Sequence, residues 1–334
     1  MRLRRAVLGG ATLVAAVCCA QAALAQSIIK IGAPTVRDNN EVWMNVFKEE
    51  VEKGTAGRYR VDTYPGGQLG SMPRSIDGVQ LGTIELTITI PEFMGGLDKR
   101  FGVISMPGVF DSPLHGYRTV QDPEFKAAYW TLGDPKGIKI AGMYCPTDTN
   151  YVFRTPVNSM ADFKAKKIRT FPSAIEREIL ATFGASPAPM SLEEVLPAIQ
   201  QGVIDGSKSG MTVFVMFKYQ PAARYAIRTN ETMICTPVLA SRAWLDKQPA
   251  DVQRVVLAAA EVADRKAQDF SRDFNENAYR EWVKGGGVLV VPKPEERAAM
   301  MKALADVAER ALKDEPEMLA MVALMKRVAE RVRR

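Results

Sequence analysis

Strand-like and helix-like patterns of apolar residues alternate along the first third of the chain. Residues 28–32, 59–64 and 86–90 are short apolar or β-branched runs, which predict strands. Residues 40–53 and 72–81 carry apolar side chains at three- and four-residue spacing, which predicts helices between those strands. This order is typical of parallel β-α-β units, so the sequence predicts an α/β fold.

The same alternation returns in the middle of the chain. Residues 167–170 and 203–206 are predicted strands, and residues 187–190 are predicted to be extended. Residues 175–183 have helical spacing, and a second helix is predicted from the capping box of Ser191 and Glu194. A second group of parallel β-α-β units is therefore expected in this part of the chain.

One long helix is predicted over residues 250–284, where neither Pro nor Gly interrupts the apolar pattern. A helix of this length spans roughly 50 Å, which is too long for one small domain. A coiled coil is the alternative, but a stripe rich in alanine and aromatic residues favours burial. Further strands are predicted at 138–144, 233–242 and 288–291, and two closing helices are separated by Pro316.

Residues 1–25 have the pattern of an export signal. Arg2, Arg4 and Arg5 precede an apolar run, and Ala23-Leu24-Ala25 is a small-residue cleavage signal. The run is too short to fit a membrane anchor well. We therefore expect export with cleavage of this segment. The sequence leaves open the general and the twin-arginine export routes.

Net charge and cysteine content narrow the function classes. Removal of the three signal arginines lowers the formal net charge from +6 to +3, too little to predict nucleic-acid binding. Two cysteines remain in the mature chain, Cys145 and Cys235, and an oxidising compartment allows a disulfide between them. Two buried free thiols are the other interpretation.

Little in the sequence supports catalysis or a cofactor. His115 is the one histidine and is predicted to lie in a surface loop, so we expect neither a transition-metal site nor any other cofactor. The glycines at 285–287 end a helix and do not begin one, which is the wrong side for a phosphate-binding loop. No nucleophile motif is present, so an α/β enzyme acting on a carboxylate has little support.

Arg169 is the strongest candidate for ligand binding. It lies at the end of the predicted strand 167–170, and ligands in such sheets bind beyond the carboxyl ends of strands. A guanidinium there can pair with a carboxylate through two hydrogen bonds. A structural pairing with Glu176 or Asp205 is the alternative.

Several motifs resemble the periplasmic solute-binding subunits of the tripartite ATP-independent periplasmic (TRAP) transporters, the dicarboxylate-binding-protein family. The resemblance covers most of the mature chain and rests on these segments: Asp162-Phe163-Lys164 with Lys167-Ile168-Arg169, Gly184-Ala185-Ser186-Pro187, Gln200 to Gly206, and Tyr64 to Gly70. It implies a two-domain periplasmic binding protein with a discontinuous chain, hinge strands and a long helix spanning both domains. It places domain I at 26–146 plus 235–274, and domain II at 147–234 plus 275–334.

The resemblance also implies a binding site. In this family an arginine at the place of Arg169 binds the ligand carboxylate, so the resemblance implies this role for Arg169. Ser209 stands where many members have an asparagine. Apolar contact is expected from Phe93, Met190 and Met211, with Thr89 at the end of a strand, although Phe93 and Met211 suit a core position equally well. These residues predict a monocarboxylate ligand with an apolar or aromatic body.

The predicted function is capture of an organic acid and its delivery to the small and large TRAP membrane subunits. A binding protein that feeds a membrane sensor kinase is the alternative with the same cleft. A monomer without nucleic-acid partners is expected. Cys145 and Cys235 are predicted to lie close together on adjacent strands where the chain crosses between the domains.

Overall fold

The computed structural model describes residues 26–333, so the predicted export signal at 1–25 lies outside the described residues. The first sheet has the strand order β2 (Tyr59–Tyr64), β1 (Ser27–Gly32), β3 (Leu86–Ile88), β10 (Met233–Ser241) and β4 (Ile138–Asp148). Strands β1, β2 and β3 are parallel, whereas β10 runs antiparallel to both β3 and β4. The predicted β-α-β-α-β order is confirmed in this sheet.

Helices connect the parallel strands of the first sheet. Helix α1 (Asn39–Gly54) follows β1, and α2 (Met72–Leu81) follows β2. The α1 helix begins at Asp38, whose carboxylate accepts hydrogen bonds from the backbone N–H groups of Asn40 and Glu41. Gly82 ends α2 in the left-handed conformation that glycine adopts without strain, with φ 79°.

The second sheet has the order β11 (Val288–Val290), β9 (Tyr225–Ile227), β5 (Asn150–Phe153), β8 (Gly206–Ser209), β6 (Lys167–Thr170) and β7 (Ser186–Pro189). Helices α5 (Ala174–Thr182) and α6 (Leu192–Gln200) join its parallel strands, and α7 (Met211–Met216) follows β8. The capping box of Ser191 and Glu194 at the start of α6 is confirmed.

The strand predicted at 203–206 is wrong, because β8 begins at Gly206. The backbone N–H groups of Val203 and Ile204 instead bond the Ala198 carbonyl and close the end of α6. Ile204 is fully buried, so this turn has the apolar character of a strand without its hydrogen bonds.

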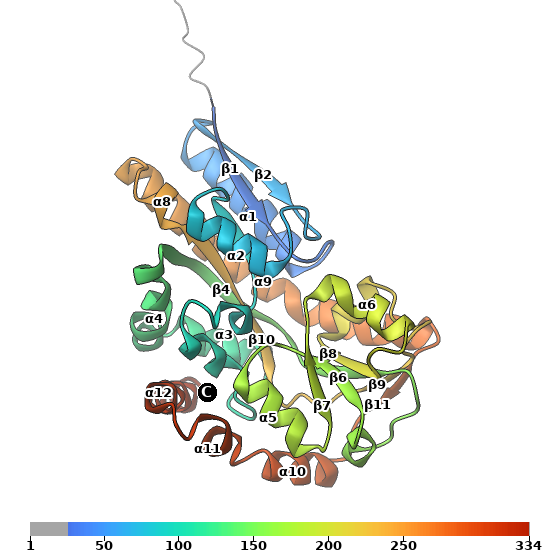
Figure 1. Ribbon diagram of the computed structural model, residues 1–334. Coiled ribbons are helices and arrows are strands. Elements are labelled where there is room, and N and C mark those ends of the chain that lie inside the picture. The colour runs from blue at the N-terminus through green and yellow to red at the C-terminus, as the bar shows by residue number, and fades with distance from the viewer. Residues whose placement is uncertain (1–25, 334) are drawn as a thin grey trace, which may run out of the picture.

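The chain crosses between the sheets at Thr149, between β4 and β5, and returns over residues 228–232, between β9 and β10. Helix α9 (Ala250–Lys284) has the predicted length. It contacts α1 and β4, which belong to the lobe built on the first sheet, and α7 and β11, which belong to the lobe built on the second sheet. Figure 1 shows α9 passing across both lobes. The predicted discontinuous two-sheet architecture is confirmed.

A disulfide joins β4 to β10 beside the first crossing. Cys145 and Cys235 are bonded, with 3.9 Å between their Cα atoms and a sequence separation of 90 positions. The structure thus has the bonded pair rather than two free thiols, on adjacent strands as predicted.

Three helices close the chain, where the sequence predicted two. They are α10 (Pro294–Ala303), α11 (Val307–Leu312) and α12 (Pro316–Val332). The last of these packs against α3 (Pro113–Gln121) and α4 (Pro123–Tyr129), which precede β4. The C-terminal helix therefore contacts the first lobe, and the domain boundaries stay a prediction.

The surface-loop prediction for His115 is wrong. His115 lies in the first turn of α3 and is 5% exposed, because α12 covers it. Its Nε2 atom is 2.8 Å from the Ala329 carbonyl oxygen, and its Nδ1 atom accepts a hydrogen bond from the backbone of Asp111. His115 thus forms a hydrogen-bond contact between α3 and the C-terminal helix α12.

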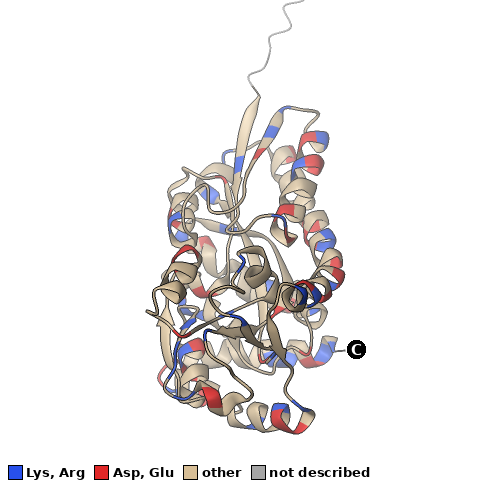
Figure 2. Ribbon diagram, turned by 90° about the vertical axis from the view of Figure 1, so that its right-hand side faces the viewer, with Lys and Arg blue, Asp and Glu red and all other residues tan. Residues whose placement is uncertain are grey.

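Basic and acidic residues are interspersed along the outer helices in the view of Figure 2. None of the helices within residues 26–333 combines the length and hydropathy needed to cross a bilayer.

Candidate functional site

A cavity lies between the two lobes, where the carboxyl ends of several strands converge. It has ≈ 610 Å³ of empty space, a figure that includes its opening to solvent. Thr35, Asp38 and Thr89 line it from the first lobe, and Arg169 and Ser209 line it from the second. This position is the one expected for a ligand site in open α/β sheets.

Arg169 is the cation in this cavity wall. It lies on β6, is 1% exposed, and stacks over the Phe171 ring at 4.8 Å. Its Nε and Nη2 atoms donate to the Met190 carbonyl oxygen, both at 3.2 Å, and Nη1 donates to the Lys208 carbonyl oxygen at 2.9 Å. A guanidinium has five N–H donors, so one donor on each terminal nitrogen stays available.

The structural alternative for Arg169 is not seen. Glu176 accepts two bonds from the Lys208 ammonium, and Asp205 accepts one from the backbone N–H of Lys167. Among the described residues, Arg169 bonds to carbonyl oxygens and to no carboxylate. Burial lowers the pKa of Arg169 to about 10, so the guanidinium remains protonated at neutral pH.

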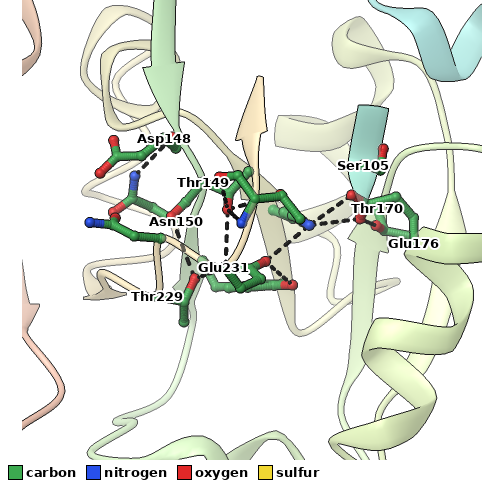
Figure 3. A network of polar contacts seen from close by, with 12 residues as sticks. Ser105, Asp148, Thr149, Asn150, Thr170, Glu176, Thr229 and Glu231 are labelled. Carbon is green, nitrogen blue, oxygen red and sulfur yellow. Dashed lines mark hydrogen bonds and ion pairs between the residues drawn. The ribbon is translucent and has the colours of Figure 1, made fainter. Parts of the chain in front are cut away.

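A second buried cation, Lys208, lies on β8, the strand adjacent to the one that carries Arg169. Its side chain is 0% exposed, and its ammonium is 2.7 Å from Glu176 and 2.9 Å from Glu231. Figure 3 shows these two carboxylates converging on one amine nitrogen. Burial alone would lower the pKa of Lys208, but Glu176 and Glu231 outweigh it and raise that pKa above its ordinary value.

Neighbouring hydroxyl groups hold both carboxylates in place. Thr170 donates to Glu176 at 2.7 Å, while Tyr151 and Thr149 donate to Glu231 at 2.9 and 3.0 Å. Glu231 lies on the segment 228–232, where the chain returns to the first sheet. The ion pair between Lys208 and Glu231 therefore links β8, which lines the cavity, to this crossing segment.

A third carboxyl group, Glu92, borders this cluster from the first lobe. It is 6% exposed and accepts a hydrogen bond from the Ser105 hydroxyl. Burial, followed by the negative charge of Glu176, raises the pKa of Glu92 to about 7. The first-lobe side of the cluster therefore carries a group that titrates near neutral pH.

The structure brings together three of the six predicted ligand residues: Arg169, Ser209 and Thr89 all line the cavity. Phe93, Met190 and Met211 do not line it. Phe93 packs against a hydrophobic core cluster that includes Met94 and Phe101. Met211 is 1% exposed and packs in the hydrophobic core of the second sheet. Met190 contributes its backbone carbonyl oxygen to Arg169.

Sequence reasoning missed the polar wall that the start of α1 contributes. Asp38 accepts from the Thr35 hydroxyl at 2.6 Å, and Asn40 donates to that same hydroxyl oxygen at 2.6 Å. All three residues line the cavity. Their position just after β1 was the available signal, because that strand end faces the same crevice as Thr89.

No group of three or more His, Cys, Asp or Glu side chains arranged to hold a metal occurs within residues 26–333.

The fold and cavity define the class as a two-lobed solute-binding protein. Residues 36–314 match the family described as "Bacterial extracellular solute-binding protein, family 7". The chain belongs to this family, the solute-binding subunits of TRAP transporters, and is a periplasmic protein.

Two relatives illustrate the sequence similarity. The chain is 30% identical to a "Solute-binding protein" of Verminephrobacter eiseniae over 71% of each chain. It is 24% identical to the "2,3-diketo-L-gulonate-binding periplasmic protein" of Escherichia coli, over 88% of this chain and 90% of that one.

Solved structures show the same fold at lower identity. A TRAP solute-binding protein from Desulfovibrio salexigens, with bound orotic acid, has a TM-score of 0.86 at 20% identity and covers 91% of this chain and 99% of its own. One from Haemophilus influenzae, with bound L-gulonate, has a TM-score of 0.85 at 21% identity and covers 90% of this chain and 99% of its own.

Proposed function

We propose that this chain is the ligand-capturing subunit of a TRAP transporter and binds a hydroxylated monocarboxylate, of the sugar-acid class, between its two lobes. Arg169 pairs with the ligand carboxylate, and Ser209 donates or accepts one further hydrogen bond. The loaded protein then delivers the acid to the small and large membrane subunits.

The observation that carries this proposal is the buried guanidinium of Arg169, which has no carboxylate partner within residues 26–333. Three hydrogen bonds to two carbonyl oxygens hold the guanidinium plane but do not neutralise its charge. A buried charge is unfavourable unless it is paired. An anionic ligand supplies the missing partner, and two N–H donors on different nitrogens suit the two oxygens of a carboxylate.

The cavity lining is mixed. Phe93, Met190 and Met211, from which apolar contact was predicted, lie outside it, whereas the apolar residues Ile90, Phe171 and Leu192 and the polar residues Asp38 and Asn40 are part of it. Ligand hydroxyl groups match the polar part of this wall. The Haemophilus influenzae protein with bound L-gulonate and the 2,3-diketo-L-gulonate-binding protein of Escherichia coli support a sugar acid as the ligand.

The proposal includes export and closure. Residues 1–25 are removed on export, and the mature monomer closes by movement of segments 26–146 plus 235–274 against 147–234 plus 275–334. Support comes from the two crossings and from α9, which spans both sheets. Hinge closure around a ligand is the usual motion of such two-lobed proteins.

The test is calorimetry of the mature protein against L-gulonate, D-galacturonate, orotate, phenylacetate and succinate. We expect a sugar acid to bind most tightly, and Arg169→Ala to lose roughly thirty- to several-thousand-fold in affinity, as expected for a desolvated charged partner. Arg177→Ala, an exposed arginine on the neighbouring α5, is the matched control and should bind like the wild type. Equal affinity in Arg169→Ala and wild type would contradict the proposal.

A further inference from the structure

Asp38 is an acidic side chain in the wall of the cavity that also contains Arg169. It is 8% exposed and comes from the first lobe, whereas Arg169 comes from the second. One carboxylate oxygen, Oδ1, accepts from the backbone N–H groups of Asn40 and Glu41, at 3.0 and 3.4 Å. The other, Oδ2, accepts from the Thr35 hydroxyl at 2.6 Å.

This arrangement leaves acceptor capacity on Asp38. Each carboxylate oxygen has about two lone-pair sites, so Oδ2 has one still available after the bond from Thr35. The capping role at the start of α1 uses Oδ1 and explains the position of the side chain, but it does not use Oδ2. Burial raises the pKa of Asp38 to about 6, so the group is largely ionised in a neutral assay buffer.

Thr89 provides a second, independent observation in the same wall. It is 0% exposed, lines the cavity, and its hydroxyl oxygen has no hydrogen-bond partner in the described part of the chain. A buried hydroxyl without a partner is unfavourable, and a ligand group can relieve that cost. Thr89 lies at the end of β3, next to the strand that leads to Asp38.

We propose that Asp38 is a specificity-determining residue that excludes a second carboxylate from the cavity and accepts a hydrogen bond from a ligand hydroxyl on the first-lobe side. This inference rests on the proposed function, since it assumes that Arg169 holds the first carboxylate. The ligand class narrows to acids with one carboxylate and a hydroxyl group that reaches the first lobe.

The two cavity walls carry opposite charges, Arg169 on the second lobe and Asp38 on the first. A sugar acid with one carboxylate places its negative charge against Arg169 and a hydroxyl against Asp38, which gives a favourable contact at each end. The matching diacid places its second negative charge against Asp38, and like charges at close range in a dry site are strongly unfavourable. Specificity here depends on a repulsive contact as well as an attractive one.

The test uses D-galactonate and D-galactarate, which share one carbon skeleton and differ in whether the far end is a hydroxyl or a carboxylate. Affinities are measured by calorimetry for wild type, Asp38→Asn, Thr89→Val and Arg169→Ala. Asparagine also caps helices well, so Asp38→Asn removes the charge and keeps the start of α1.

We expect wild type to prefer galactonate by about a hundredfold, the size of a charge-dependent discrimination at a buried site. Asp38→Asn should reduce that preference at least about tenfold, because galactarate gains affinity. Thr89→Val should weaken galactonate about fivefold, the loss of one neutral hydrogen bond.

The variants separate failure of this inference from failure of the proposed function. If Arg169→Ala abolishes galactonate binding while Asp38→Asn keeps the wild-type preference, the role of Asp38 is wrong and the carboxylate anchor stands. Galactarate binding to wild type as tightly as galactonate would overturn the role of Asp38 directly. Galactonate binding that does not depend on Arg169 would overturn the anchor itself.

Discussion

Arg169 and Lys208 are two buried cations on adjacent strands, and their surroundings are opposite. Lys208 has two carboxylates within 2.9 Å, and hydroxyl groups hold both of those carboxylates. Arg169 has three hydrogen bonds to carbonyl oxygens and no ion pair in the described part of the chain. One charge is compensated within the protein, and the other is not.

This difference indicates a structural role for Lys208 and supports the proposed ligand-binding role of Arg169. The Lys208 carbonyl oxygen accepts from Arg169 Nη1 at 2.9 Å, so the compensated residue also positions the uncompensated one. A group that holds the fold together keeps its partner permanently, whereas a group that must bind and release a ligand has to do without one between cycles. The unpaired buried charge therefore lowers the stability of the ligand-free protein.

The largest expected effect is that of removing the compensated charge. Lys208→Met leaves Glu176 and Glu231 buried without a cation, and breaking a buried pair in this way costs about 3–5 kcal/mol of unfolding free energy. Urea unfolding of the mature protein measures it.

The matched control for that variant is the triple substitution Lys208→Met, Glu176→Gln, Glu231→Gln, which removes all three charges together. It should recover much of the lost stability, because replacing a whole buried ionic cluster by neutral groups is often nearly neutral. A Lys208→Met protein as stable as wild type would show that the two cations do not differ as we describe.

Removing the uncompensated charge of Arg169 should not destabilise the ligand-free protein, in contrast to Lys208→Met. Arg169→Met keeps the apolar stem and relieves a desolvation cost, so the empty protein should be as stable as wild type or more stable. The stabilisation by ligand, about 2.7 kcal/mol at a concentration of 100 times the Kd for wild type, should be lost. Thermal unfolding with and without a sugar acid measures both. A large loss of stability in the ligand-free Arg169→Met protein would contradict the comparison.

The sequence indicated Arg169, the proposed ligand-binding cation, better than it indicated the structural cation Lys208. Arg169 stands at the end of an apolar strand, and a local pattern is enough to mark it. Lys208 lies between serines in a segment that resembles a polar turn, and its partners are 32 and 23 positions away in sequence. Such long-range pairing leaves no local periodicity, so neither the buried triad nor its role was predictable from spacing.

The same reasoning explains the uneven prediction of the fold and the site. Strand β6 and helix α9 have long or well-bounded apolar patterns, and their predicted limits are confirmed. Whether an apolar residue faces a core or a cavity depends on the neighbouring elements, which is why Met211 was placed in the ligand site. The polar wall around Asp38 was missed because a helix cap and a ligand contact use the same residue type.

Glu92 gives a smaller effect, which depends on pH. Its pKa is about 7 in the folded protein, above the ordinary value of 4.5, so the folded state binds this proton more tightly than the unfolded state. Stability from this group is therefore present at low pH and is lost as the pH rises through about 7, with a slope of at most about 1.4 kcal/mol per pH unit.

Glu92→Gln should flatten that dependence between pH 5 and 8 and stabilise the protein at pH 8, because the amide keeps an acceptor for Ser105 without a charge. Urea unfolding at several pH values measures the slope. Asp38 and Asp264 also have raised pKa values, so part of the slope should remain. An unchanged slope in Glu92→Gln would show that Glu92 does not titrate in this window.

The smallest expected effect is at Ser209, where a ligand contact adds to the anchor without carrying charge. Ser209 is 4% exposed and lines the cavity on β8, next to Lys208. Ser209→Ala should weaken sugar-acid binding by about 0.5–1.5 kcal/mol, the size of one neutral hydrogen bond, and leave the stability of the empty protein unchanged. Calorimetry beside the exposed control Ser186→Ala measures the difference. A loss as large as that of Arg169→Ala would mean that Ser209 positions the guanidinium or the ligand carboxylate itself, and that the charge on Arg169 is not the main source of affinity.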